Sequence, residues 1–146
     1  MRIYMDLCCF NRPFDDQNAP QIYIETEAKL IIQNMIIQGE IELVWSYMLD
    51  YENSANPDDA VKETIDRWKK VSVAMTEQTD GILSIANRLK KIGIGTKDAV
   101  HVACAAFLKA DCFVTVDKGI IERRDRIAEI AILNPIEFVQ KLEETR

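Results

Sequence analysis

Four acidic residues stand where carboxylates could do chemistry. Asp6 and Asp117 each follow a short apolar run of strand-forming residues, and Asp98 lies in the expected first turn of a helix. The fourth acid is Glu52 or Asp50, two residues apart in a helical stretch that follows another short strand. Because the carboxyl ends of parallel strands meet at one edge of an open α/β sheet, we expect these acids to lie together.

Each acid also has an ordinary explanation. Asp6 could cap the start of a helix, Asp98 suits the positive end of a helix dipole, and Asp50 could be a solvated surface acid. Together, however, the carboxylates would raise one another's pKa and oppose folding unless a cation joined them. Hard oxygen ligands favour Mg²⁺ or Mn²⁺, which can clamp a phosphodiester and activate the attacking water. The pattern therefore indicates metal-assisted hydrolysis of a phosphodiester.

Alternating strand and helix patterns must position these acids. With 146 residues, of which 48% are hydrophobic, the chain suits one domain over residues 1–146. We expect an α/β fold, a three-layer α/β/α sandwich with a mainly parallel central sheet and right-handed crossovers. The expected strands are 2–6, 42–46, 71–75, 112–116 and 127–133, and the main expected helices are 21–38, 58–70, 76–91 and 136–144.

Several local details follow from periodicity and capping preferences. Thr76 and Thr96 are expected N-caps of two helices, and residues 7–16 are expected to form a loop or half-turn. Lys29 is expected on the charged side of helix 21–38, opposite a buried stripe formed by Ile24, Ala28, Ile31, Ile32 and Met35. His101, within an apolar run, is interpreted as a helix-packing residue outside the site.

Charge and cysteine content exclude other classes of protein. A net charge of −6 and a pI near 4.9 argue against non-specific coating of duplex nucleic acid, although a metal-filled acidic cleft can still accept a phosphate. The four cysteines lack zinc-ribbon spacing, so we expect reduced core thiols and no structural zinc. With neither a signal peptide nor a membrane span in the sequence, we expect a cytoplasmic protein without a membrane partner.

The order and context of the acids resemble the PIN domain family of metal-dependent nucleases, and in particular its VapC-like toxins. The resemblance covers nearly the whole chain. It rests on the opening strand with Asp6, on Ser46 followed by Glu52, and most specifically on Ala86, Leu89, Gly93, Asp98, Ala103, Ala106, Asp111 and the run Val114-Thr115-Val116-Asp117. It implies that Asp6, Glu52, Asp98 and Asp117 are both the metal ligands and the catalytic residues, with Thr115 as a supporting hydroxyl.

The chain departs from the family pattern after the first aspartate. Many members have Ser, Thr or Asn there, whereas this chain has Leu7-Cys8-Cys9. Asn11 is the candidate replacement for that polar support. Arg12 and Lys118 are the first candidates for contact with a substrate phosphate, followed by Lys97, Arg123 and Arg124, for which ordinary surface charge is the alternative.

The sequence therefore predicts an endoribonuclease that depends on Mg²⁺ or Mn²⁺ and hydrolyses RNA with a metal-activated water. The resemblance adds a role as the toxin of a toxin–antitoxin pair, with an antitoxin protein as partner, and we expect a homodimer. The alternative is a PIN-like module that has lost activity and works by binding another protein, which the negative charge and Leu7-Cys8-Cys9 would suit. A receiver-like or phosphatase-like domain ranks last, because its late strand would end in Lys rather than Asp117.

Overall fold

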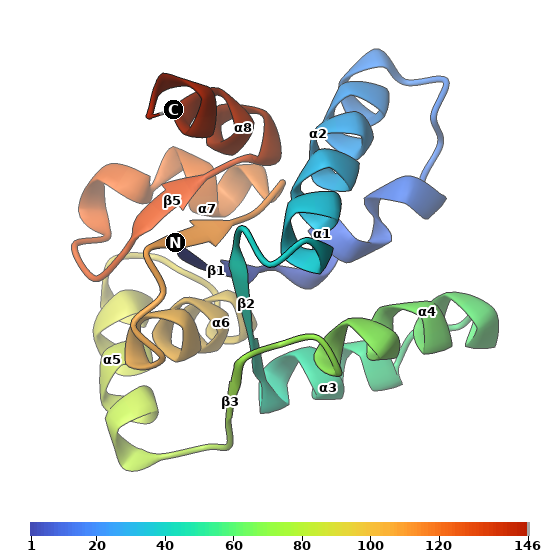
Figure 1. The fold of residues 1–146 in the computed structure, drawn as a ribbon. Coiled ribbons are helices and arrows are strands. Elements are labelled where there is room, and N and C mark those ends of the chain that lie inside the picture. Colours follow the sequence, from blue (N-terminus) through green and yellow to red (C-terminus); the bar gives the residue numbers. More distant parts are fainter. Residues whose placement is uncertain (146) are drawn as a thin grey trace.

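A computed structural model describes residues 1–145 and contains one five-stranded sheet (Figure 1). All neighbouring strands pair in parallel, in the order β3-β2-β1-β4-β5. The strands are β1 (Arg2–Met5), β2 (Glu42–Ser46), β3 (Ala74–Thr76), β4 (Cys112–Val114) and β5 (Ala131–Leu133). The expected α/β class and parallel sheet are confirmed.

Helices lie on both sides of this sheet. Figure 1 shows α2 (Pro20–Ile37) and α8 (Pro135–Glu144) together on one side and α5 (Asp80–Lys91) and α6 (Thr96–Phe107) together on the other. The remaining helices are α1 (Leu7–Asn11), the 3₁₀ turn η1 (Arg12–Phe14), α3 (Tyr47–Ser54), α4 (Asp59–Lys69), α7 (Lys118–Glu122) and the 3₁₀ turn η2 (Arg124–Arg126). The arrangement is the expected three-layer sandwich. Within residues 1–145, no helix combines the length and apolar character needed to cross a membrane.

The order in which successive strands are added to the sheet reverses at β1 and β4, while all strands stay parallel. It runs from β1 outward through β2 to β3, then returns to place β4 on the other side of β1. Ile3 is paired with Leu43 of β2 and with Cys112 of β4, and all three side chains are buried. The crevice at the carboxyl ends of β1 and β4 is therefore the topological switch point, where ligands bind in open α/β sheets.

The buried face of α2 is not the one predicted. Ala28 and Ile32 are buried as expected, but Ile24 and Ile31 are each 49% exposed. Lys29, expected on the charged side, is only 3% exposed. The error has a physical cause, because α2 carries apolar residues around most of its circumference and its periodicity does not single out one face.

Four other local predictions were wrong. Thr76 ends β3 instead of capping a helix, and the N-cap of α5 is Thr79, whose hydroxyl accepts a hydrogen bond from the Ile82 amide at 3.2 Å. Gly95, rather than Thr96, is the N-cap of α6. The segment 7–16, expected to be a loop, forms α1 and η1, and the last strand is confined to Ala131–Leu133. The four cysteines are free thiols, as predicted.

Candidate metal and active site

Asp6 lies at the carboxyl end of β1 and is only 5% exposed. One carboxylate oxygen accepts a hydrogen bond from the Leu7 amide at 2.8 Å, which makes Asp6 the N-cap of α1. The other oxygen accepts a hydrogen bond from the Thr115 hydroxyl at 2.9 Å and contacts the Cys8 thiol at 3.4 Å. Asp6 is thus a helix cap and also one of the four acids, Asp6, Glu52, Asp98 and Asp117, that make up what we call the acidic edge. The two interpretations are compatible.

Thr115 joins the first and last acids of the site. Its hydroxyl is fully buried, donates to Asp6 and accepts a hydrogen bond from the Asp117 amide at 3.0 Å. The Asp117 carboxylate in turn accepts a hydrogen bond from the Ile120 amide at 3.2 Å and caps α7. One side chain therefore links the ends of β1 and β4 across the switch point.

Asp98 lies in the first turn of α6, as predicted, and its carboxylate interacts electrostatically with the other acids. Burial, together with the negative charges of Asp117 and Asp6, raises the pKa of Asp98 from 3.8 to about 6. Burial also raises the pKa of Asp6. Carboxylates from three separate segments therefore interact closely enough to oppose one another's ionisation.

Glu52, rather than Asp50, faces this edge of the sheet. The Glu52 carboxylate hydrogen-bonds to Nε2 of His101, and this contact holds the pKa of Glu52 below its usual value. Asp50 accepts a hydrogen bond from the Trp45 indole at 2.9 Å and pairs with Lys69 at 2.8 Å. The two acids are thus separated in the way expected for residues two positions apart on a helix.

His101 is fully buried and belongs to the acidic edge, although the sequence analysis left it outside the site. Its Nδ1 lies 2.6 Å from the Tyr4 hydroxyl, and its Nε2 lies 3.9 Å from Asp6 as well as contacting Glu52. Burial disfavours the charged ring, but the Glu52 hydrogen bond and the charge of Asp6 outweigh it and raise the pKa of His101. The Tyr4 hydroxyl also contacts Ser46 at 2.6 Å, so a buried polar chain supports Glu52.

Asn11 does not contact Asp6 through any hydrogen bond within residues 1–145. Its amide oxygen instead accepts a hydrogen bond from Asn56 at 3.3 Å, and both residues line a pocket of about 510 Å³ that Glu52 also borders. The polar group beside Asp6 is the thiol of Cys8, which also lies 3.5 Å from the Thr115 hydroxyl. Cys8, within the run that departs from the family pattern, thus supplies a weak donor of its own.

The predicted phosphate contacts lie beside one another. Arg12 and Lys118 line a shared pocket of about 400 Å³. Arg12 is already paired with Glu25 and Asp15, both at 3.0 Å, whereas Lys118 makes no ion pair within residues 1–145.

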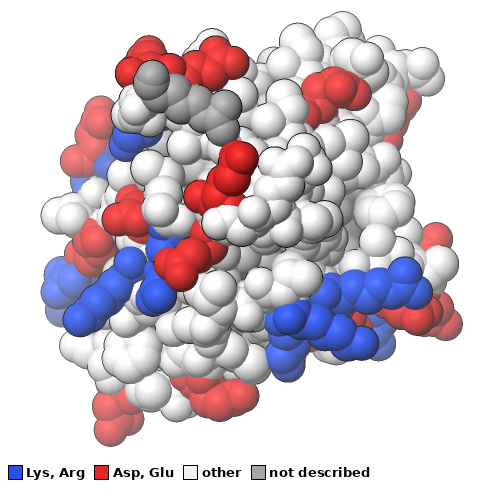
Figure 2. Space-filling view, viewed as in Figure 1, with Lys and Arg blue, Asp and Glu red and all other residues white. Residues whose placement is uncertain are grey.

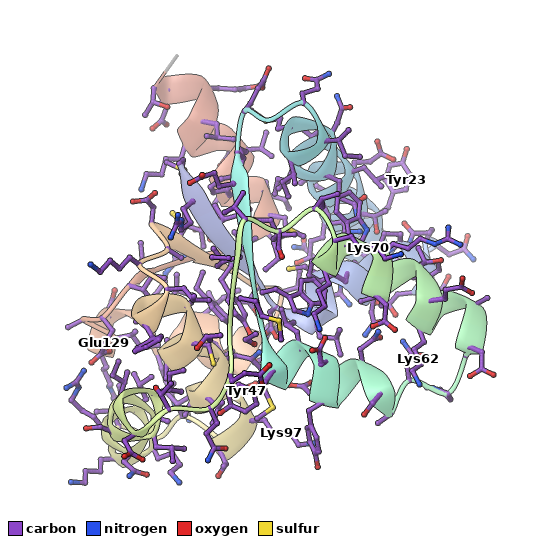
Figure 3. The ribbon with its side chains drawn as sticks, turned by 60° about the horizontal axis from the view of Figure 1, so that its bottom comes forward. Tyr23, Tyr47, Lys62, Lys70, Lys97 and Glu129 are labelled. Carbon is purple, nitrogen blue, oxygen red and sulfur yellow. The ribbon has the colours of Figure 1, made fainter. Side chains whose placement is uncertain are left out.

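The other candidate cations are more scattered. Lys97, labelled in Figure 3, lies with its ammonium 5.8 Å from the centroid of the Tyr51 ring, and its charge helps to lower the pKa of Glu52. Arg123 donates to the Gly119 carbonyl, and Arg124 pairs with Glu137 at 2.9 Å.

The donor chemistry of the acidic edge fits a hard divalent cation. Asp6, Glu52, Asp98 and Asp117 supply carboxylate oxygens. The raised pKa of Asp98 reflects burial and, after it, neighbouring negative charge, which a cation would offset. As the side chains stand, no group of three or more His, Cys, Asp or Glu residues in the described chain has the spacing to hold a metal ion. Ligation would therefore require side-chain adjustment, with the Glu52–His101 contact the most direct competitor.

The fold is a PIN-like three-layer α/β sandwich, as the sequence resemblance predicted. A chain of the crystal structure of VapBC2 from Rickettsia felis, bound to a DNA fragment from their promoter, is similar with a TM-score of 0.58. The alignment covers 92% of this chain and 98% of that chain at 14% identity, so the likeness concerns the fold. No protein-family model and no curated protein matches the sequence.

Proposed function

We propose that the protein is an endoribonuclease that depends on Mg²⁺ or Mn²⁺. The observation that carries the proposal is the convergence of Asp6, Glu52, Asp98 and Asp117, from four segments, on the switch point of a parallel sheet. These four residues would hold the metal. When bound, a divalent ion would lower the pKa of the attacking water and offset the charge that develops on the phosphate.

The residues around the acids would prepare the site. The Thr115 hydroxyl orients Asp6 by donating a hydrogen bond to its carboxylate. The same hydroxyl orients Asp117 by accepting a hydrogen bond from its backbone amide. His101, fixed by Tyr4, holds the Glu52 carboxylate near Asp6. Lys118 is available to pair with a substrate phosphate, because it has no acidic partner in the described chain. Supporting contacts of this kind orient ligands and are worth about 10- to 100-fold in metal affinity or activity.

The decisive variant is Asp98→Asn, with Asp50→Asn as the matched control. Both remove one carboxylate charge, but Asp50 is engaged with Trp45 and Lys69, away from the acidic edge. With labelled single-stranded RNA and Mn²⁺, Asp98→Asn should abolish cleavage and Asp50→Asn should retain it. Unchanged cleavage by Asp98→Asn would contradict the assignment of Asp98 to the metal site. Titration calorimetry with Mn²⁺ separates this function from an inactive binding module, which would take up no ion at millimolar concentrations.

A narrower proposal is that the nuclease is the toxin of a toxin–antitoxin pair. It rests on the resemblance to VapC-like toxins and on the fold shared with the VapBC2 structure. Expression of the protein in a bacterial host should then arrest growth, and Asp6→Asn should relieve the arrest. Growth unaffected by the wild-type chain, despite RNA cleavage in vitro, would favour a role in RNA processing. We also propose a homodimer, which light scattering would test directly.

A further inference from the structure

A pocket of about 510 Å³ adjoins the acidic edge at Glu52 and extends beyond the proposed metal site. Its walls come from α1, η1, the turn between α3 and α4, and the start of α4. The volume lies within the range of roughly 300 to 1,000 Å³ that is typical of ligand sites. Because the pocket borders a proposed metal ligand, whatever it binds would lie next to the reacting phosphodiester.

Three residues joined by hydrogen bonds form a polar wall of this pocket. The Asn56 amide nitrogen donates to the Asn11 amide oxygen at 3.3 Å, and the Asn56 oxygen accepts from the Asp58 backbone amide at 3.3 Å. One Asp58 carboxylate oxygen caps α4 by accepting from two backbone amides at 2.9 and 3.2 Å. In the described chain, the amide nitrogen of Asn11 and the second Asp58 oxygen make no hydrogen bond. The wall therefore offers a ligand both a donor and an acceptor.

The turn that carries the polar wall is anchored to α4. The buried side-chain amide of Asn53 donates to the Lys62 carbonyl at 3.0 Å and to the Asp66 carboxylate at 2.7 Å. The Asn56 backbone amide donates to the Asn53 carbonyl at 3.0 Å. These contacts fix the turn before a ligand arrives, which reduces the entropy that binding would cost.

The rest of the lining favours a flat, uncharged ligand that can donate hydrogen bonds. The apolar lining residues are Leu7, Phe14, Ala55, Pro57 and Val61, and the carboxylates are Asp15, Glu52 and Asp58. Phe14 is 50% exposed, so one aromatic side chain is accessible for stacking. Among the described lining residues there is no Lys or Arg, so an anionic group would be repelled. A nucleobase from a single strand has the required shape and donors.

We propose that this pocket takes one unpaired guanine of the RNA substrate, whose amino group donates to Asp58 and whose carbonyl oxygen accepts from Asn11. Guanine carries both groups on one edge, whereas adenine lacks the carbonyl and uracil lacks the amino group. The adjacent N1–H and N2–H of guanine also suit a carboxylate better than the single amino group of cytosine. This specificity site rests on the proposed ribonuclease function, because the guanine would belong to the strand that the metal site cuts.

Positive charge lies next to this acidic pocket on α4. Figure 2 shows a group of Lys and Arg side chains over α4, the helix that begins at the pocket. Lys62, labelled in Figure 3, is four residues beyond Asp58 and makes no ion pair in the described chain. The base would thus enter an acidic pocket, while the phosphates beside it would have positive charge near them on α4.

Nuclear magnetic resonance titrations in EDTA measure binding of nucleotides without metal-dependent cleavage. GMP should bind the full chain more tightly than AMP, CMP or UMP and should shift the side-chain amide signals of Asn11 and Asn56. IMP, which lacks only the amino group of GMP, should bind about tenfold more weakly, as expected for loss of a hydrogen bond to a charged group.

Asp58→Asn tests the carboxylate, with Asp59→Asn as the matched control. Asparagine also caps helices well, and both variants remove one negative charge from the same turn. Asp58→Asn should weaken GMP about tenfold and IMP little, because the two changes remove one contact. Asp59, which does not line the pocket, should change the Kd of GMP less than threefold on substitution. Circular dichroism checks the fold, and Asp58→Ser replaces Asp58→Asn if that variant is not folded.

Cleavage gives a second readout. With Mn²⁺, RNA strands that carry a single guanine within a run of uracil should be cut at a fixed distance from the guanine. Asn11→Ala should weaken this preference while leaving Mn²⁺ binding in calorimetry unchanged. The exposed amide variant Asn87→Ala, on α5, should keep the preference.

Several outcomes would overturn the guanine site. Equal affinity for GMP and IMP, equal affinity of the wild type and Asp58→Asn for GMP, or tighter binding of AMP, CMP or UMP would each exclude the proposed contacts. Cleavage of RNA without any GMP binding would refute the guanine site and leave the nuclease function standing. GMP binding by a chain that cleaves no RNA would support the guanine contacts and contradict the nuclease function.

Discussion

Replacing Lys29 with methionine should stabilise the isolated protein near pH 7. Methionine keeps an unbranched chain between Phe10 and Trp68 but removes the buried charge. The lowering of the Lys29 pKa from 10.5 to about 8 corresponds to roughly 3 kcal/mol of unfavourable free energy for the charged form. Two cation–π contacts near the outer limit of their range return about 1 kcal/mol. The expected net gain in the free energy of unfolding is therefore about 2 kcal/mol.

The pH dependence has a definite sign. The folded-state pKa of Lys29 is lower than the unfolded value, so between about 8 and 10.5 the unfolded chain binds more protons than the folded one. The wild type should therefore gain stability relative to Lys29→Met as the pH rises through this window. The advantage of the variant should be complete below pH 8 and largely gone by pH 10.5.

Urea unfolding at a series of pH values measures both effects. Wild type, Lys29→Met and the exposed control Lys70→Met should have equal m-values, and the control should stay within about 0.5 kcal/mol of the wild type. A Lys29→Met variant that is less stable than the wild type at pH 7, by an amount that does not change with pH, would refute the reasoning. It would mean that the aromatic rings fully offset the free-energy cost of burying the Lys29 ammonium.

Three further predictions concern the acidic edge. In EDTA at pH 7.5, Asp98→Asn should unfold at a higher temperature than the wild type, because Asp98, with a pKa near 6, is ionised beside other carboxylates; equal melting at pH 7.5 would argue against that repulsion. Thr115→Val should lower stability by about 1 to 3 kcal/mol in urea unfolding and cleavage by at least about tenfold, since it removes the hydroxyl bonded to Asp6, whereas Thr115→Ser should restore both. Glu52→Gln should weaken Mn²⁺ binding in calorimetry and Asp50→Asn should not, and the opposite ranking would exchange their roles.

The positions of the four acids in the fold could be predicted because these residues lie near the ends of elements. A carboxylate directly after an apolar strand, as at Asp6, or three residues beyond its end, as at Asp117, has its position along the sheet set largely by the strand itself. Glu52 and Asp50 were harder to separate, because sequence alone does not fix the rotation of a helix about its axis. The structure separates them through partners that are distant in sequence, His101 for Glu52 and Lys69 for Asp50.

Helix-capping preference gave the wrong N-cap where two residues of the same type lie close together in the sequence. Thr76 and Thr79 are equally good caps by type, and pairing of β3 with β2, at Thr76 and Ser46, decided between them. Burial of His101 followed correctly from its apolar surroundings, but its contact with Glu52 depends on a helix 49 residues earlier in the chain. Such contacts are properties of the assembled sheet and have no local signature.

Lys29 and the acidic edge are both places where folding buries ionisable groups at a cost in free energy. Burial lowers the pKa of Lys29, and at the acidic edge burial and the neighbouring carboxylates raise the pKa of Asp98. Folding alone stabilises neither arrangement, so the rest of the core must supply the free energy that holds them in place. Sequence patterning identified the acidic edge because clustered acids are conspicuous at strand ends. It missed Lys29 because a lysine in an apolar helix is normally assigned to solvent, and only the position of α4 shows that this one is enclosed.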